Sequence, residues 1–257
     1  MPSCPPTIAA VLQDLSVAIA LFALMLVALE AGFRAGRRPN ADKDPRGSGQ
    51  VGAIQGAILG LLGLLLAFSF GAAGSRFLER QQLIVREANA IGTAYLRADL
   101  LDEPHRSELR AALARYTEHR IDVSSRLRGG LPPAAVADVE QLHARIWNAA
   151  SAGVAARPAA MLGVLPPVNE LIDLHTTRMA TGRIRLPPLV VGLLVAYSAL
   201  AIGIIGYGCG LGGGRRAPLT VSLAFLLGSV LWITFDLDHP RAGLIRLSDA
   251  PLKALKF

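Results

Sequence analysis

The chain of 257 residues is long enough for one or two soluble domains, but 52% of its residues are apolar and only 18% are charged, against about 25% charged in soluble proteins. Its formal charge of +7 resembles that of some nucleic-acid-binding proteins. Its basic residues, however, lie beside apolar runs or alternate with acids, without a basic stripe interleaved with stacking aromatics. We therefore expect a lipid bilayer as partner and no nucleic acid.

Four apolar segments are each long enough to cross the roughly 30 Å hydrocarbon layer of a bilayer as a helix. They are Ile8–Leu29, which Glu30 ends, then Val51–Ser75, Leu186–Gly212 and Ala217–Phe235. Because every backbone amide in hydrocarbon needs an internal hydrogen-bond partner, such segments must be helices. The glycine-rich run 206–214 lacks the Lys-Ser/Thr of a phosphate-binding loop, so we expect a flexible turn there.

The segment Arg76–Arg185 differs from its flanks, with 15 basic and 12 acidic residues. Its first part predicts one helix that continues the second span, because apolar positions recur at alternating spacings of four and three. The stripe runs through Phe77, Gln81, Ile84, Ala88, Ile91, Tyr95 and Ala98, with Gln81 as its polar member. No proline or glycine cluster separates this helix from the span before it.

Three more helices follow in the same segment, each preceded by proline. The first begins after Pro104 and ends near Gly129-Gly130; Pro132-Pro133 open the second, Pro166-Pro167 open the third, and Pro187-Pro188 separate it from the next span. The predicted fold is all-α: four transmembrane helices with a helical bundle inserted between the second and third. The expected parts are residues 1–75, 76–185, 186–237 and a C-terminal tail, 238–257.

Basic residues near the spans bear on orientation. The two short loops hold Arg34, Arg37, Arg38, Lys43, Arg46, Arg215 and Arg216, and the tail holds Arg241, Arg246, Lys253 and Lys256. The positive-inside rule then predicts a multi-pass protein of the inner (plasma) membrane with cytoplasmic short loops and an extracytoplasmic bundle. Six arginines of the middle segment lie next to the second and third spans. When they are counted as well, the rule predicts a cytosolic bundle, so this alternative stays open.

Chemical motifs are sparse. Histidines 105, 119, 143 and 175 show no HExxH-type spacing, and the chain has no GxSxG or SxxK motif. We expect no enzyme, no catalytic residue, no metal and no cofactor. On the second span, Gly52, Gly56 and Gly60 line one face, which indicates packing within the chain, a subunit interface or a pore-facing helix.

Two stretches hold the candidate functional residues. The first contains Glu87, Asn89, Gly92, Tyr95 and Arg97, and the second contains Asp236, Asp238, Pro240 and Gly243. Carboxylates at a membrane boundary are costly unless they are hydrated, paired or ion-bound. The second stretch is therefore either a polar turn with Asp238 paired to an arginine, or a cation or gating site.

Both stretches, EANAIGTAYLR at 87–97 and LDHPRAGLIRLSDAPL at 237–252, resemble the bacterial and plant membrane proteins with a bestrophin-like domain. The resemblance covers nearly the whole chain, although His239 stands where the family usually has arginine. It implies relatedness to bestrophins, which are pentameric chloride channels with cytosolic helical domains. No bestrophin pore residue is matched.

Two functions remain open at this point. One is a channel-like homo-oligomer that passes a small anion, in which the glycine face mediates assembly. The alternative is a membrane-anchored sensor or scaffold whose helical domain binds a protein partner.

Overall fold

The computed structural model describes residues 8–38, 45–126, 133–240 and 243–257, and the regular elements within these ranges are all helices. The helices are α1 (Ile8–Gly36), α2 (Pro45–Arg97), α3 (His105–Arg126), α4 (Pro133–Ala156), α5 (Met161–Arg183), α6 (Pro188–Leu211), α7 (Ala217–Asp238) and α8 (Ala250–Lys253). Short 3-10 turns lie at Ala98–Leu100 and Pro158–Ala160. The all-α prediction is confirmed, including the single helix α2 that continues beyond the second span. The end expected near Gly129-Gly130 lies outside the described residues.

Four of the helices are long and apolar enough to cross a membrane, as predicted. The expected end of the first one at Glu30 is wrong, because α1 continues to Gly36. The Glu30 carboxylate accepts hydrogen bonds from Arg34, at 2.8 Å, and from Arg215, at 3.1 Å. Glutamate is itself a good helix former, so Glu30 ends the apolar run but not the helix.

The chain divides into two compact units. The membrane unit comprises the described residues within Pro6–Arg76 and Arg185–Ile245, and the bundle unit comprises Phe77–Ile184 and Arg246–Phe257. Helix α2 contributes its first part to the membrane unit and its last part to the bundle unit. The C-terminal residues thus belong to the same unit as α3, α4 and α5.

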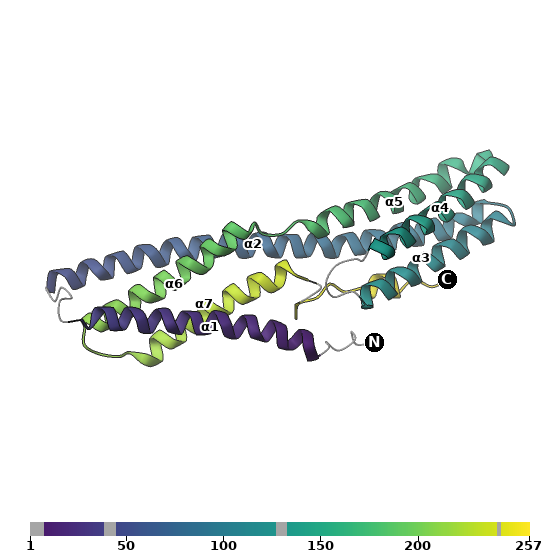
Figure 1. Ribbon diagram of the computed structural model, residues 1–257. Coiled ribbons are helices and arrows are strands. Elements are labelled where there is room, and N and C mark those ends of the chain that lie inside the picture. Colours follow the sequence, from purple (N-terminus) through teal and green to yellow (C-terminus); the bar gives the residue numbers. More distant parts are fainter. Residues whose placement is uncertain (1–7, 39–44, 127–132, 241–242) are drawn as a thin grey trace. The chain divides into compact units, whose positions relative to one another are not determined.

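In the membrane unit, α1 and α6 pack with their backbones nearly touching (Figure 1). A Cβ atom added to Gly32 would lie 1.8 Å from the carbonyl oxygen of Gly203, and one on Gly206 would lie 2.2 Å from that of Leu29. A Cβ on Gly210 would lie 2.4 Å from the Phe33 oxygen. The flexible turn expected at 206–214 is therefore wrong for its first part, since these glycines are helical and provide the closest helix contact.

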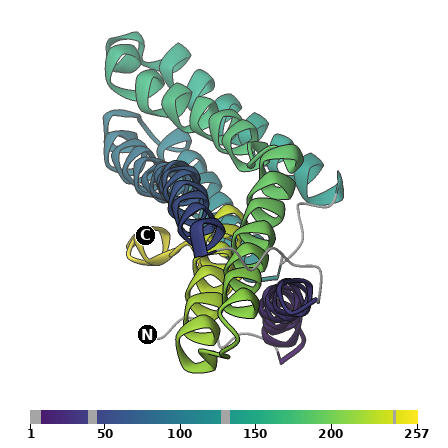
Figure 2. The same ribbon diagram turned by 90° about the vertical axis from the view of Figure 1, so that its left-hand side faces the viewer.

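The bundle unit has a continuous apolar core from α2, α3, α4 and α5, which run alongside one another (Figures 1 and 2). On α2 the predicted seam is buried at Ile84, Ala88, Ile91 and Ala98, while Phe77, Gln81 and Tyr95 are half-buried. Leu252 of α8 completes this core and is 1% exposed. The C-terminal segment thus contributes Leu252 to the bundle's interior.

The start predicted for the last bundle helix at Pro166-Pro167 is wrong, because both prolines lie inside α5. Val164, before the prolines, is buried on the same core as Val168, and this packing favours an earlier start at Met161. A proline donates no backbone hydrogen bond, so Pro167 leaves the carbonyl of Gly163 unpartnered within the helix. The Arg97 guanidinium donates to that carbonyl at 3.1 Å and replaces the missing amide.

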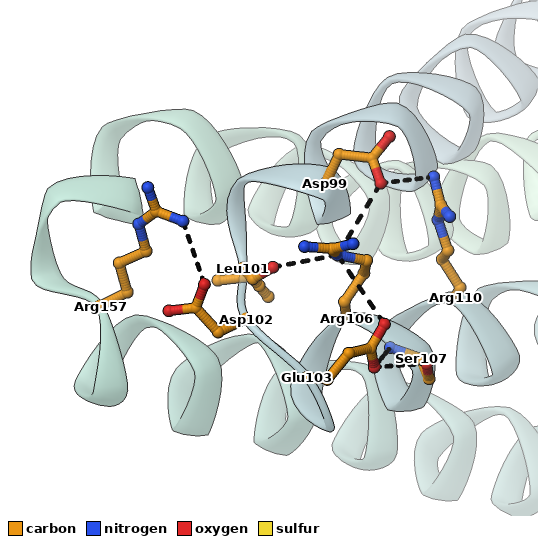
Figure 3. Close-up of polar contacts among 8 residues, drawn as sticks. All are labelled: Asp99, Leu101, Asp102, Glu103, Arg106, Ser107, Arg110 and Arg157. Carbon is orange, nitrogen blue, oxygen red and sulfur yellow. Dashed lines mark hydrogen bonds and ion pairs between the residues drawn. The ribbon is translucent and has the colours of Figure 1, made fainter.

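An ion-pair network holds the turn between α2 and α3 (Figure 3). Asp99 pairs with Arg110 at 2.8 Å, and Arg106 donates from Nε to the Leu101 carbonyl at 3.1 Å. Glu103 accepts hydrogen bonds from the Ser107 amide and hydroxyl, which covers the first turn of α3. In the same view Arg157, from the end of α4, reaches Asp102 at 3.2 Å. The turn is therefore fixed by side chains rather than by glycine.

We predict that Gly206→Ala lowers the thermal unfolding midpoint of the detergent-solubilised protein by several degrees, because the new methyl group must push α1 and α6 apart. Overpacking of this kind typically costs about 1–3 kcal/mol. Gly192→Ala is the matched control: it lies on the same helix with nothing within 4 Å among the described residues. Equal midpoints for the two variants would contradict the close helix contact.

Candidate functional site

The centre of the bundle unit is a buried carboxylate, Glu87 of α2, which is 0% exposed. Its Oε1 accepts hydrogen bonds from the Tyr116 hydroxyl at 2.5 Å and from Arg120 Nε at 3.0 Å, both on α3. Its Oε2 forms an ion pair with Arg178 of α5. Three helices thus meet at one side chain.

Burial sets the charge states around this carboxylate. A buried ion pair is tolerated only where the lost hydration is replaced by well-placed partners, and Glu87 has cationic partners on both oxygens. Burial also raises the pKa of Tyr116 to about 12, although the nearby charge of Arg120 opposes this effect. Tyr116 therefore remains a protonated donor, and the carboxylate is an acceptor held by donors rather than a free base.

Two histidines lie beside this centre. The His143 ring lies 5.2 Å from the Tyr116 ring and 4.9 Å, edge to face, from that of His175. Burial first, and the charge of Arg120 second, lower the pKa of His143 to about 4. His143 is therefore neutral at physiological pH. Among the described residues, no group of three or more His, Cys, Asp or Glu side chains is placed to hold a metal ion.

The other candidates on α2 do not join Glu87. Asn89 is exposed, and Gly92 faces the C-terminal segment, where an added Cβ would lie 3.4 Å from Leu255 Cδ2. The Tyr95 ring lies 5.0 Å from that of Phe257 and 4.7 Å below the Arg110 guanidinium. Residues 87–97 therefore take part in several separate contacts of α2 and do not form one site.

Two arginines of α2 supply hydrogen bonds to backbone carbonyls of α5, at both ends of that helix. Arg97 reaches Gly163 near its start, and the buried Arg80 donates to Thr181 and Ile184 at its end. Carbonyls in the last turn of a helix have no amide partner within the helix. Arg80 thus serves as a side-chain cap, a role that its sequence context does not predict.

The second stretch contains two buried carboxylates with different partners, both in the membrane unit. Asp236 accepts hydrogen bonds from the amides of Leu244 at 2.8 Å and Ile245 at 2.7 Å. Asp238 accepts from Arg76, with its closest nitrogen at 3.1 Å, and from the Leu186 amide at 2.9 Å. The polar-turn interpretation with an Asp238–arginine pair matches these contacts, and both carboxylates already have protein donors.

Pro240 and Gly243 shape the chain that returns to Asp236. Pro240 is buried after the end of α7, and Gly243 lies against the Asp236 carboxylate. A Cβ added at Gly243 would lie 1.9 Å from Asp236 Oδ1. This position therefore requires glycine for reasons of space. His239 is exposed, and its Nδ1 lies 2.9 Å from the Phe235 carbonyl oxygen.

The predicted glycine face of α2 is open. Gly52, Gly56 and Gly60 are exposed, and nothing in the described part of the chain lies within 4 Å of a Cβ added to any of them. Packing within the chain, one of the expected roles, is therefore absent for these three glycines within the described residues. In the membrane unit, close helix packing instead involves Gly32 of α1 and Gly206 and Gly210 of α6.

Several partners that build these sites are missing from the sequence-based prediction. Glu87 and Asp238 were candidates, but Arg120, Arg178 and Arg76, which are distant along the chain and bring the compensating charge, were not. The available signal was arginine within otherwise apolar helical positions, because a buried arginine needs an acidic or carbonyl partner. That signal does not identify the partner.

Four membrane-length helices together with a helical bundle define a multi-pass α-helical membrane protein. The family model of the Bestrophin-like domain matches residues 17–252. The chain therefore belongs to the Bestrophin-like family, as the two stretches indicated. Comparison with curated proteins and with solved structures gave no match.

We predict that Glu87→Gln destabilises the protein by about 3–5 kcal/mol, because it leaves two buried arginines without their carboxylate. Tyr116→Phe removes one hydrogen bond to a charged group and is expected to cost about 1.5–3 kcal/mol. Denaturant unfolding in detergent measures both losses. Glu118→Gln, at an exposed position of α3, is the matched control, and a loss for Glu87→Gln no larger than the control's would contradict the buried cluster.

The His143 environment predicts a pH dependence. Between pH 6.5 and about 4, the unfolded chain binds a proton at this histidine that the folded chain does not bind. The free energy of unfolding therefore falls as the pH falls through this window. For a partly exposed side chain the loss is on the order of 1 kcal/mol. His143→Gln should make the free energy of unfolding less dependent on pH in this window. An unchanged slope would contradict a contribution from His143.

Proposed function

We propose that the chain assembles into a channel-like homo-oligomer in a bacterial inner membrane and passes a small anion without a catalytic step. The observation that supports this proposal best is the open glycine face of α2 at Gly52, Gly56 and Gly60. Membership of the Bestrophin-like family agrees with it. The resemblance to bestrophins supplies the expectation of a shared central path.

The contrast between two sets of glycines supports assembly through α2. Small residues allow helices to approach closely in membranes, where dispersion and weak hydrogen bonds drive association. On α1 and α6, Gly32, Gly206 and Gly210 are already in backbone contact within the chain. Those of α2 repeat at the same spacing and face no described part of the chain, so a second copy is the partner that suits them.

The bilayer itself is the competing neighbour for this face. Farther along α2 the exposed side chains are large and apolar, including Leu61, Leu64 and Phe68, the last 69% exposed. These suit acyl chains, whereas exposed glycines leave grooves that acyl chains fill poorly. We therefore place the subunit contact at the glycine-bearing start of α2.

For orientation we propose cytoplasmic short loops and an extracytoplasmic bundle unit. The support is the arginine-rich first loop, since translocation of several basic residues is unfavourable. The resemblance to bestrophins favours a cytosolic bundle unit instead. Cysteine labelling from either side, at an exposed bundle position such as Asn89, tests the choice: labelling from the cytoplasmic side alone would reverse it.

One observation favours the sensor or scaffold alternative. Leu100, Met161 and Leu162 are exposed at one end of the bundle unit, with Leu162 84% exposed. They lie near the contact between Arg97 and Gly163. Exposed apolar residues gathered at one place are typical of protein-binding surfaces. A protein partner that binds there would support this second function.

We predict that Gly56→Leu reduces the subunit number measured by native mass spectrometry, because the leucine fills the groove that a second helix needs. Ala57→Leu is the control, since it adds similar bulk at an exposed position one residue around the same helix. The wild-type protein should be a closed ring, with anion conductance in planar bilayers that Gly56→Leu abolishes. A monomeric wild type, or a ring without conductance, would count against the channel and turn attention to the scaffold.

A further inference from the structure

A pocket of about 290 Å³ opens among α1, α6 and α7 of the membrane unit. Its lining combines the apolar side chains of Leu26, Leu29, Phe33 and Val221 with the charged residues Glu30, Arg215 and Arg216. The pocket does not involve the bundle unit or the glycine face of α2. It is therefore independent of the proposed channel.

The charged side of the pocket has an excess of cations. Arg215 and Arg216 line the pocket, and Glu30 is the acidic residue among its described lining residues. Arg34 pairs with Glu30, and the Arg37 guanidinium lies 5.7 Å from the Phe33 ring. Glu30 already binds Arg34 and Arg215. The Arg216 side chain is exposed at the start of α7. The rim therefore suits an anionic group.

Two further features position such a group. The Arg215 guanidinium lies 4.5 Å above the Phe33 ring, which holds it against the pocket wall. Helix α7 begins directly after Arg216, and Arg216 provides no side-chain cap to its first turn. The amino end of a helix carries partial positive charge and unpaired amides, both of which favour a phosphate. Pro218 in this first turn has no amide, so the turn offers one donor fewer than usual and the two arginines supply most of the contacts.

The apolar side of the pocket extends into the membrane-spanning part of the chain. Leu26 and Leu29 belong to the span Leu15–Gly36, and Val221 belongs to the span Ala217–Asp238. A free phosphate ion needs no such wall, and it would lose hydration beside it. A ligand with a phosphate and an acyl chain matches both halves.

We propose that this pocket binds an anionic phospholipid, whose headgroup phosphate contacts Arg215, Arg216 and the first turn of α7. One acyl chain lies along Leu26, Leu29 and Val221. Basic pockets between membrane helices recognise anionic headgroups through charge, and apolar walls add selectivity for a lipid over a soluble anion. The lipid also screens the arginines that Glu30 alone does not neutralise.

Native mass spectrometry of the delipidated full-length protein tests this binding with added phosphatidylglycerol or phosphatidylcholine of equal chain length. We expect phosphatidylglycerol to bind at least tenfold more tightly. Arg215→Gln/Arg216→Gln should weaken its binding about 30-fold, because removal of each positive charge near the headgroup lowers the affinity about fivefold. Arg115→Gln/Arg145→Gln removes two exposed arginines of the bundle unit and should leave the affinity unchanged.

Two further measurements separate the alternatives. Val221→Trp fills the apolar side while retaining both arginines, and it should also weaken phosphatidylglycerol binding. A millimolar excess of inorganic phosphate should not displace the lipid. Equal binding of the two lipids, an unchanged affinity in the arginine variant, or displacement by inorganic phosphate would each overturn the proposal. If the double variant does not fold, Arg216→Gln alone provides the test, because it retains the Arg34 and Arg215 partners of Glu30.

Discussion

The membrane unit depends on one constraint: a backbone in hydrocarbon must satisfy its own hydrogen bonds. Helices satisfy these hydrogen bonds internally. The hydrophobic effect does not drive their association in the bilayer, however, because lipid tails are as apolar as leucine. In this protein, glycine allows close packing between helices: the backbones of α1 and α6 nearly touch at Gly32 and Gly206. Polar contacts such as Gln55 to the Ile204 carbonyl, at 2.8 Å, supplement this packing.

The bundle unit is held together by side-chain packing and buried charges rather than by close contact of glycine backbones. It has ordinary apolar packing around Ile91, Leu113 and Leu171, but its centre is the charged cluster of Glu87. A buried carboxylate with two arginines contributes little net stability compared with an apolar core, yet it penalises any arrangement that separates its members. Glu87, Arg120 and Arg178 lie on three helices, so the cluster selects one register among them. The arginines of α2 that reach α5 carbonyls add to the same selection.

Sequence periodicity is sufficient to predict the helices and the seam of α2, because burial of one face imposes a regular spacing. It fails where a non-local contact decides the outcome. Prolines 166 and 167 have the pattern of a helix start, but core packing of Val164 and the hydrogen bond from Arg97 allow the helix to begin earlier. Glu30 ends the apolar run but not α1, because glutamate favours a helix, and Arg215 from the α6–α7 loop pairs with it. The partners of Glu87 and Asp238 are likewise beyond the sequence, since pairing between distant residues leaves no periodic trace.

The close contact of α1 with α6 has a consequence for how the protein is made. The two helices are separated in the chain by α2 and by the first segment of the bundle unit, Phe77–Ile184. During synthesis α1 enters the membrane with its glycine backbone covered only by lipid, and it stays so until α6 is complete. The α1–α6 contact therefore cannot form before Phe77–Ile184 has been translated. A chain whose synthesis stops within this segment therefore leaves the close-packing glycine of α1, Gly32, without its helix partner in the bilayer.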